Sequence, residues 1–139
     1  MHHLRKTHKR YKSYGPSQGC DFCDAEHTAP RIVQELEHAY VIPNRTFYDV
    51  WEMRRVTDHL LIIPKRHVLH LSQLSKAERA DIINAMAQYE AEGYQIYARS
   101  PDSGARSVPH QHTHLIKTDN RPGRALLFLR RPYILWRLR

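Results

Sequence analysis

One segment of the chain has the pattern of a long helix, and it divides the sequence into two parts. Ser75 and Glu78 have the spacing of a capping box, in which each side chain bonds the backbone amide of the other residue. Residues at helical spacing follow, namely Ile82, Ile83, Met86, Tyr89, Tyr94 and Tyr97. We therefore expect a helix from Ser75 to about Ala98, with Gly93 as a weak point inside it.

Strand patterns lie on both sides of this helix. Residues 31–42 have two β-favouring runs around a charged centre, which predicts a hairpin, and residues 46–53 are aromatic-rich. Residues 59–63 form an unbroken apolar run closed by Pro64, as expected of a strand buried on both faces. Further strands are expected at 108–117, 125–129 and 133–138, after a turn at 101–104. This order predicts an α+β domain with a mainly antiparallel sheet.

The net charge of +8 is concentrated at the two ends of the chain. Residues 1–12 carry five basic side chains and residues 121–139 carry six, with no acid in either segment. The 11 basic and 14 acidic residues between them give a net charge of −3. We expect a flexible basic arm over residues 1–19 and one domain over residues 20–139. Basic ends attract polyanions, so non-specific contact with nucleic acid is one expectation, and solubilising tails are the other.

The sequence has no apolar stretch near 18 residues, which argues against a membrane span. The basic N-terminus is not followed by the apolar region of a secretory signal. Two cysteines are too few for a disulfide scaffold. We therefore expect a soluble, cytoplasmic protein.

Three histidines alternate at His110, His112 and His114. In a strand, alternate side chains point to one face, so the three imidazoles would share a face, whereas a helix would scatter them. Such a group could bind a metal, or it could attack phosphorus and transfer protons. A polar strand face exposed to solvent is the third interpretation.

A second candidate site is the pair Cys20 and Cys23. The Cys-x-x-Cys spacing suits either zinc or thiol redox chemistry, and two unliganded thiols are the plainest interpretation. The intervening Asp21-Phe22 does not match a thioredoxin-type motif. Zinc would need two further ligands, and the candidates are His59, His67, His70 and one of the alternating histidines.

Together these motifs resemble the histidine-triad (HIT) superfamily of nucleotide hydrolases and transferases. The triad is followed by Leu115-Ile116, and an apolar strand ends in Pro64-Lys65-Arg66-His67 before Leu71-Ser-Gln-Leu74-Ser75 and the helix. The Cys-x-x-Cys pair points to the zinc-bearing branch of the superfamily. The resemblance implies a HIT-like fold, with a mainly antiparallel sheet of five to six strands, one long helix and a short one.

The resemblance also assigns roles to individual residues. It implies that His112 is the nucleophile and that His114 helps to position the phosphate. In the zinc-bearing branch the metal ligands correspond to Cys20, Cys23, His67 and His110. Such a closed Cys2His2 site would hold a structural Zn2+.

The chain departs from the family pattern near the triad. Arg106 stands where glutamine is usual, and Arg99 lies where asparagine often helps to bind phosphate. A guanidinium can still grip a phosphate. The expected substrate-binding residues are Ser107, Arg106, Arg99, Gln111, Asp49 and Glu52, with the two acids as candidates for the ribose hydroxyls.

The implied function is hydrolysis or nucleotidyl transfer at an α-phosphate through a covalent nucleotidyl-histidine. Phosphoramidates and dinucleoside polyphosphates are the expected substrates, and a homodimer is implied. The alternative is a non-catalytic nucleotide or nucleic-acid binding module with a zinc-stabilised HIT-like fold. A small zinc-stabilised structural domain without a ligand is a third interpretation.

Overall fold

The computed structural model describes residues 19–24, 28–123, 125–129 and 134–138. The chain divides into two compact units. One unit comprises Ser17–Asn44 and Leu60–Leu115, and it contains the helix and both candidate motifs. The other comprises Met1–Pro16, Arg45–His59 and Ile116–Arg139. The arm expected at residues 1–19 lies almost wholly outside the described residues, and its boundary stays a prediction.

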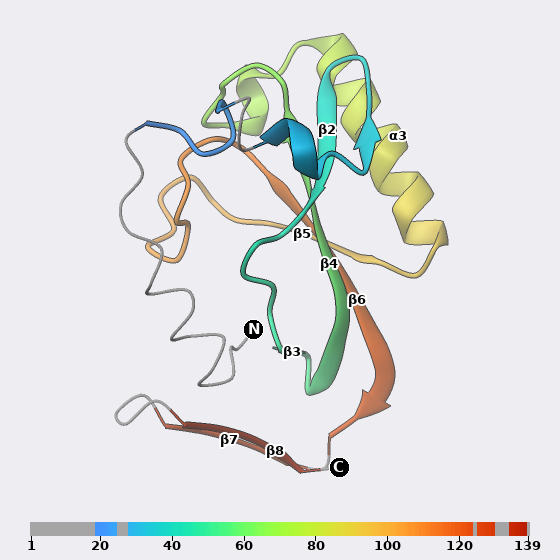
Figure 1. The fold of residues 1–139 in the computed structure, drawn as a ribbon, viewed down its shortest axis with the longest axis vertical. Coiled ribbons are helices and arrows are strands. Elements are labelled where there is room, and N and C mark those ends of the chain that lie inside the picture. Colours follow the sequence, from blue (N-terminus) through green and yellow to red (C-terminus); the bar gives the residue numbers. More distant parts are fainter. Residues whose placement is uncertain (1–18, 25–27, 124, 130–133, 139) are drawn as a thin grey trace. The chain divides into compact units, whose positions relative to one another are not determined.

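The main sheet confirms the expected α+β fold class. Its six strands have the order β1-β2-β4-β6-β5, with β3 paired to β4, and the β1–β2, β2–β4 and β3–β4 pairs are antiparallel. Figure 1 shows β2, β4 and β6 in the body of the sheet. The bounds of the six strands are β1 Gln34–Glu35, β2 Ala39–Pro43, β3 Val50–Trp51, β4 Arg54–Pro64, β5 Gln95–Ala98 and β6 Thr113–Pro122.

Residues 59–64 of β4 are buried on both faces, as the apolar run before Pro64 predicts, and most of β2 is buried beside them. Alternate residues on a strand point to opposite faces, so each strand contributes to two separate clusters. One cluster joins β2, β4, β6 and the helix, and its members include Val41, Ile62, Leu115, Ile82 and Tyr89. The other comprises Ile42, Leu61 and Ile63, with Phe22, Ile32 and Tyr40 packed against it. Phe22 thus ties the cysteine segment to the sheet.

Helix α3 (Lys76–Ala91) begins as its capping box predicts. The Ser75 hydroxyl accepts a hydrogen bond from the Glu78 amide at 3.2 Å, and a Glu78 carboxylate oxygen accepts one from the Ser75 amide at 2.6 Å. The helix packs against β2 and β5. Two three-residue 3-10 turns, η1 (Ala29–Arg31) and η2 (Leu71–Gln73), are the short helical segments.

The predicted extension of the helix to Ala98 is wrong. Gly93 adopts φ 89°, a left-handed conformation that favours glycine and ends the helix. The Gly93 amide donates to the Glu90 carbonyl at 2.8 Å, and the Tyr94 amide donates to the Tyr89 carbonyl at 3.0 Å. These two bonds form a Schellman motif, whose usual apolar contact is made by the rings of Tyr89 and Tyr94. The residues that follow are released to form β5.

Two predicted strands are shorter or begin later than expected. The 46–53 segment contributes only β3, because the Tyr48 amide bonds the His59 ring rather than a neighbouring strand. Strand β6 starts at Thr113 instead of residue 108. Pro109 has no amide to donate, and side chains take the carbonyls of Val108, Pro109 and His110. His110 and His112 therefore lie before the strand, and only His114 lies within it.

The described residues at the end of the chain form a two-stranded antiparallel hairpin. Strands β7 (Ala125–Leu129) and β8 (Ile134–Leu138) pair with Ala125 opposite Leu138, close to the prediction. Among the residues that the structure describes, no helix has the length and apolar content needed to cross a lipid bilayer.

Candidate metal centre and active site

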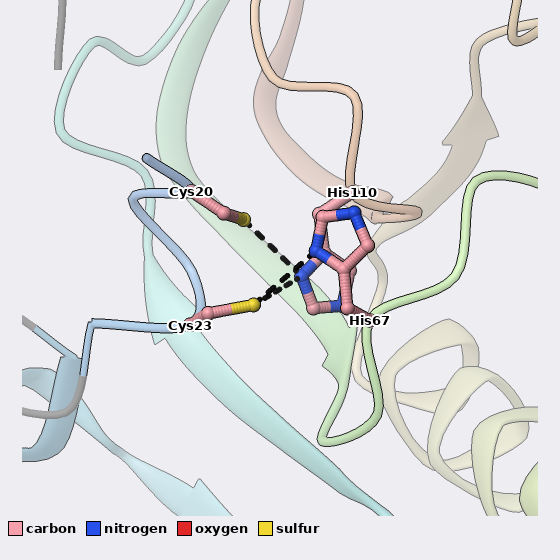
Figure 2. A group of neighbouring side chains, drawn as sticks. All are labelled: Cys20, Cys23, His67 and His110. Atoms are coloured by element: carbon pink, nitrogen blue, oxygen red, sulfur yellow. Dashed lines mark hydrogen bonds between the residues drawn. The ribbon is translucent and has the colours of Figure 1, made fainter. Parts of the chain in front are cut away.

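Two cysteines and two histidines from three separate segments meet in one cluster. The thiol and imidazole ligand atoms of Cys20, Cys23, His67 and His110 all lie within 4.8 Å of one another. Figure 2 shows the two sulfurs facing the two imidazoles. The Sγ–Nδ1 distances are 3.5 Å for Cys20 to His110, 3.3 Å for Cys23 to His67 and 3.4 Å for Cys23 to His110. The structure thus brings together all four residues that the family resemblance assigns to the metal.

The cysteine side of the cluster is a tight turn. The Cys23 amide donates to the Cys20 carbonyl at 2.9 Å, which brings both thiols to the same side. The Asp21 carbonyl accepts a hydrogen bond from the Thr28 hydroxyl at 3.3 Å. Phe22, between the cysteines, places its ring edge-on to His110 and His112, at centroid distances of 6.0 and 5.3 Å.

The histidine side of the cluster has fixed ring orientations. His110 is fully buried, and its Nε2 lies 3.0 Å from the Pro64 carbonyl oxygen. A carbonyl can only accept, so Nε2 carries the proton and Nδ1 presents its lone pair to the sulfurs. Metal-bound histidines commonly donate their second ring nitrogen in this way. The His67 ring lies 4.6 Å from the His110 ring.

The protonation states follow from burial and neighbouring groups. Burial, together with the charge of His67, lowers the pKa of His110 to about 4, so the ring is neutral at neutral pH. Partial burial and the Cys20 thiol raise the pKa of Cys23 to about 11. A divalent cation would displace the thiol protons, because the thiolate is the form that binds metal.

The donor set suits a structural zinc ion. Two sulfurs and two imidazole nitrogens form the tetrahedral combination common in structural zinc sites. All four positions would come from the protein, so such a site leaves no position for a substrate. Cys20, Cys23, His67 and His110 are therefore the residues that could hold the metal.

His112 lies beside this cluster and is held as a neutral ring. Only 7% of its surface is exposed, and its Nδ1 lies 2.8 Å from the His110 carbonyl oxygen. Nδ1 must carry the proton, which leaves the Nε2 lone pair available for attack. Burial lowers the pKa of His112, and the nearby charges of Arg106 and Arg99 act in the same direction. The arrangement thus favours the nucleophilic form of the ring.

His114 continues the row of rings. It is 5% exposed, and its centroid lies 5.0 Å from that of His112 in an edge-to-face arrangement. On its other side, 5.7 Å away, is the ring of Tyr97 in β5. The Arg99 guanidinium lies over that ring at 5.6 Å. Arg99 is therefore connected to His114 through Tyr97.

The other predicted substrate-binding residues of this unit, Ser107, Arg106 and Gln111, differ in exposure and in their hydrogen bonds. Ser107 is exposed, as a phosphate-contacting hydroxyl would have to be. Arg106 donates four hydrogen bonds to protein acceptors, which are the carbonyls of Leu69, Val108 and Pro109 and the side-chain oxygen of Gln111. Gln111 is buried and donates to the His112 carbonyl at 3.3 Å.

Asp49 and Glu52, the candidates for the ribose, belong to the other unit. Their role stays a prediction. His59 also belongs to that unit, where its ring accepts from the Tyr48 amide at 3.1 Å. At His70 the backbone amide donates to the Gln73 side chain at 2.9 Å, and the carbonyl accepts from the Gln73 amide at 3.1 Å. The ring contact of His59 agrees with a structural role, and the role of the His70 ring stays a prediction.

Phe22 and Tyr97 contact the triad although the motifs predict no functional role for either. Phe22 stands between the cysteines, so a metal cluster shared with His110 would have to bring its ring close to the triad. The position of Phe22 in the Cys-x-x-Cys motif could therefore have predicted its contact with the triad. Tyr97 was expected in the helix, and only the termination at Gly93 places it in β5.

Comparisons with known proteins agree with this geometry. Residues 54–121 match the family model described as HIT domain. A bis(5'-adenosyl)-triphosphatase from Saccharomyces cerevisiae strain S288c is 34% identical over 70 residues, covering 44% of this chain and 34% of that protein. The chain thus matches only about a third of the length of this curated relative.

Solved structures show the same fold. A HIT family protein from Bacillus anthracis aligns with a TM-score of 0.57 and 22% identity, over 78% of this chain and 77% of that one. A HIT family hydrolase from Clostridium thermocellum aligns with a TM-score of 0.55 and 21% identity, over 79% of this chain and 100% of that one. The main sheet, helix α3 and the histidine cluster agree with a HIT-like fold. Residues 54–121 therefore match a HIT domain, and the Cys-x-x-Cys cluster is compatible with the zinc-bearing branch.

Proposed function

We propose that the chain is a nucleotide hydrolase or nucleotidyltransferase that acts at an α-phosphate, with His112 as the nucleophile. The observation that carries this proposal is the state of the His112 ring. It is buried and neutral, and its Nδ1 proton is committed to the His110 carbonyl. Nε2 is then the only ring atom that can attack phosphorus.

The reaction has two in-line steps. In the first, the Nε2 lone pair forms a bond to the α-phosphorus, and the bond to the leaving group breaks. In the second, water or another acceptor forms a bond to phosphorus and loses a proton, and the P–N bond breaks to restore the neutral ring. The protein contributes mainly positioning and charge stabilisation in such reactions.

The neighbouring polar groups support this role. We propose that Ser107, Arg99 and His114 contact the phosphate oxygens as negative charge develops on them. The exposed hydroxyl of Ser107 and the guanidinium of Arg99 suit an anionic group. Asp49 and Glu52 remain the proposed contacts for the ribose hydroxyls.

A zinc ion bound by Cys20, Cys23, His67 and His110 is proposed as a structural part of the site. Its chemistry would be to hold the cysteine turn against the His110 segment. Because the His110 carbonyl also accepts a hydrogen bond from the Nδ1–H of His112, an ordered His110 keeps His112 in one tautomer.

The comparisons support a nucleotide substrate. One relative is named bis(5'-adenosyl)-triphosphatase, and one structural neighbour is titled a hydrolase. We extend this activity to the present chain as part of the proposal, with dinucleoside polyphosphates and nucleoside phosphoramidates as the first substrates to test.

The experiment compares wild type with His112→Ala on a diadenosine polyphosphate and an adenosine phosphoramidate. We expect His112→Ala to lose at least about 1,000-fold in kcat/KM, because no other group replaces the nucleophile. His38→Gln, a histidine whose amide bonds Asp81, is the matched control and should retain activity. Mass spectrometry of quenched wild type should find a nucleotidyl group on the peptide that contains His112.

Two outcomes would overturn the proposal. If His112→Ala retains wild-type turnover, another group is the nucleophile. Alternatively, wild type binds nucleotides but turns over neither substrate, and the non-catalytic binding module is then the better description.

The assembly and the environment of the protein also belong to the proposal. We propose a homodimer and a cytoplasmic location, and sedimentation and fractionation would test them. Non-specific contact between the basic ends and nucleic acid is proposed from charge alone. The five basic residues at the N-terminal end lie outside the part of the chain that the structure describes.

A further inference from the structure

The loop that carries His110 and His112 has no helix or strand of its own. Residues 99–112 form turns and bends between β5 and β6. Two successive turns, closed by bonds from the Ser103 amide to the Ser100 carbonyl and from the Arg106 amide to the Ser103 carbonyl, bring the chain to Arg106. The next residues must then present a metal ligand and a neutral ring in fixed positions. Because this loop has no strand hydrogen bonds, side-chain bonds must hold the two histidines in place.

Arg106 supplies this support through its guanidinium. Its Nε donates to the Val108 carbonyl at 3.2 Å, and one terminal nitrogen donates to the Pro109 carbonyl at 2.6 Å and the Gln111 side chain at 3.4 Å. The other terminal nitrogen donates to the Leu69 carbonyl at 3.0 Å. An arginine has five N–H groups, so four are committed to the protein.

These bonds connect the two segments that carry the histidine ligands. Leu69 lies two residues after His67, and Pro109 directly precedes His110. A backbone bond lies beside them, from the Gln111 amide to the Val68 carbonyl at 2.7 Å. The guanidinium and this bond together fix the distance between the segments, and therefore the distance between the two imidazoles.

We infer that Arg106 is a positioning residue that holds the His67 and His110 segments together, rather than a phosphate ligand. The four protein acceptors account for this role. A lysine has a single ammonium group without the planar fork, so it cannot reach three carbonyls in these directions. A glutamine at this position would donate at most two hydrogen bonds. The arginine is therefore required by this loop for its geometry as well as its charge.

The inference concerns the metal cluster and its loop, so it does not depend on catalysis by His112. It can be tested in the full chain without any nucleotide. The probes are Co2+, whose absorption reports thiolate and imidazole ligands, and hydrogen exchange of the Gln111 amide in the metal-free protein. The variants are Arg106→Lys and Arg106→Gln. Arg79→Gln, an exposed arginine that donates to the Ser75 carbonyl, is the matched control.

We expect both Arg106 variants to bind Co2+ about 10- to 100-fold more weakly, the range seen when a group supporting a ligand is removed. The Gln111 amide should exchange at least about 10-fold faster, while amides inside α3 keep wild-type rates. Arg79→Gln should match wild type in both measurements. Arg106→Lys should bind Co2+ no better than Arg106→Gln, because lysine keeps the charge but lacks the planar guanidinium that makes the bonds.

The opposite pattern would overturn the inference. If Arg106 served mainly as a phosphate ligand, both variants would bind Co2+ like wild type, and only the KM for a nucleotide would rise, with partial rescue by lysine. Loss of exchange protection throughout α3 in Arg106→Lys would also contradict it, because the role is confined to the loop. If the His112→Ala experiment contradicted the proposed nucleophile, the expected Co2+ affinities and exchange rates of the Arg106 variants would stay the same.

Discussion

The two sides of the metal cluster are built differently. We call residues 20–24 the cysteine half, and residues 64–70 with 106–111 the histidine half. The cysteine half is a single turn held by backbone bonds from Cys23 to Cys20 and from Thr28 to Asp24, by the Thr28 hydroxyl and by the Phe22 ring. The histidine half is held by two arginines, a buried glutamine and one backbone bond between its segments, from the Gln111 amide to the Val68 carbonyl.

Arg66 shows how far the histidine half extends into the fold. It precedes His67, and it makes two bonds to the carboxylate of Glu78, at 2.9 and 2.7 Å, and one to the Gln73 carbonyl. Glu78 is the capping-box residue of α3. Hydrogen bonds thus connect the start of α3, the His67 segment and the loop of residues 99–112 in one continuous network. The difference between the halves suggests that the protein prepares two of the proposed ligands in advance, whereas a bound ion would secure the other two.

The largest effect should come from removing one ligand from each half. Cys23→Ser and His110→Asn should each weaken zinc binding by more than about 100-fold, which exceeds the cost of losing a supporting group. Cys23→Ser should leave the Gln111 amide protected from exchange, since the histidine half does not depend on the cysteine turn. His110→Asn should lower that protection as well. Zinc competition with a chromogenic chelator and hydrogen exchange measure the two effects.

Asp21→Asn, a change within the same turn that removes no ligand, is the control for this pair. The comparison fails if Cys23→Ser, or removal of zinc from wild type by a chelator, exposes the Gln111 amide as much as His110→Asn does. The ion would then be organising both halves.

A smaller effect is expected for Glu78→Gln, which weakens the network behind His67. Bonds from Arg66 and from the Ser75 amide lower the pKa of Glu78 from 4.5 to about 2. A lowered pKa means that this carboxylate stabilises the folded state fully above about pH 4.5, and that the contribution is lost as the pH falls towards 2. We expect the variant to lose about 1–2 kcal/mol at pH 7 and progressively less in acid.

Urea unfolding of metal-free wild type and Glu78→Gln at pH 7 and pH 3 measures this difference. Glu90→Gln, at an exposed position on the same helix, should be close to neutral at both pH values. A destabilisation by Glu78→Gln that is equal at pH 7 and pH 3 would contradict the assigned contact.

The smallest effect is expected in the other unit, at the turn between β3 and β4. Glu52 and Met53 adopt φ values of 47° and 63°, although such two-residue turns favour glycine. Met53→Gly should stabilise the protein by about 0.5–1 kcal/mol by removing the cost of a left-handed side-chain-bearing residue. Zinc affinity should not change, because none of the four ligands belongs to this unit.

Thermal unfolding and zinc competition check both parts of this prediction. Met53→Ala keeps the unfavourable φ and removes most of the side chain, so it should give no gain. A change in zinc affinity for Met53→Gly would show that the cluster is sensitive to the other unit.

Much of the site could be predicted from the sequence, because short motifs carry it. The capping box at Ser75 located the helix start, and the family pattern selected His67 over His59 and His70 as a ligand. What the sequence did not predict depends on side-chain bonds to backbone carbonyls. The start of β6 is set by side chains that take the carbonyls before Thr113. Spacing rules cannot foresee such competition for backbone groups.

The end of the helix was predicted incorrectly for a different reason. Gly93 was recognised as a weak point, but apolar residues after it continued the helical spacing. The positive φ and the two carbonyl bonds of the Schellman motif decided the outcome. Arg106 shows the same limitation in another form, because its position near the triad pointed to phosphate while its partners lie at Leu69 and Gln111.

One residue links the proposed metal site to the proposed nucleophile. His110 offers its ring to the sulfur cluster and its carbonyl to the Nδ1 proton of His112. Exchanging zinc for an ion with different bond lengths would shift that carbonyl, and with it the aim and basicity of the neighbouring imidazole. Metal replacement would therefore change the reactivity of the His112 ring without any amino-acid substitution.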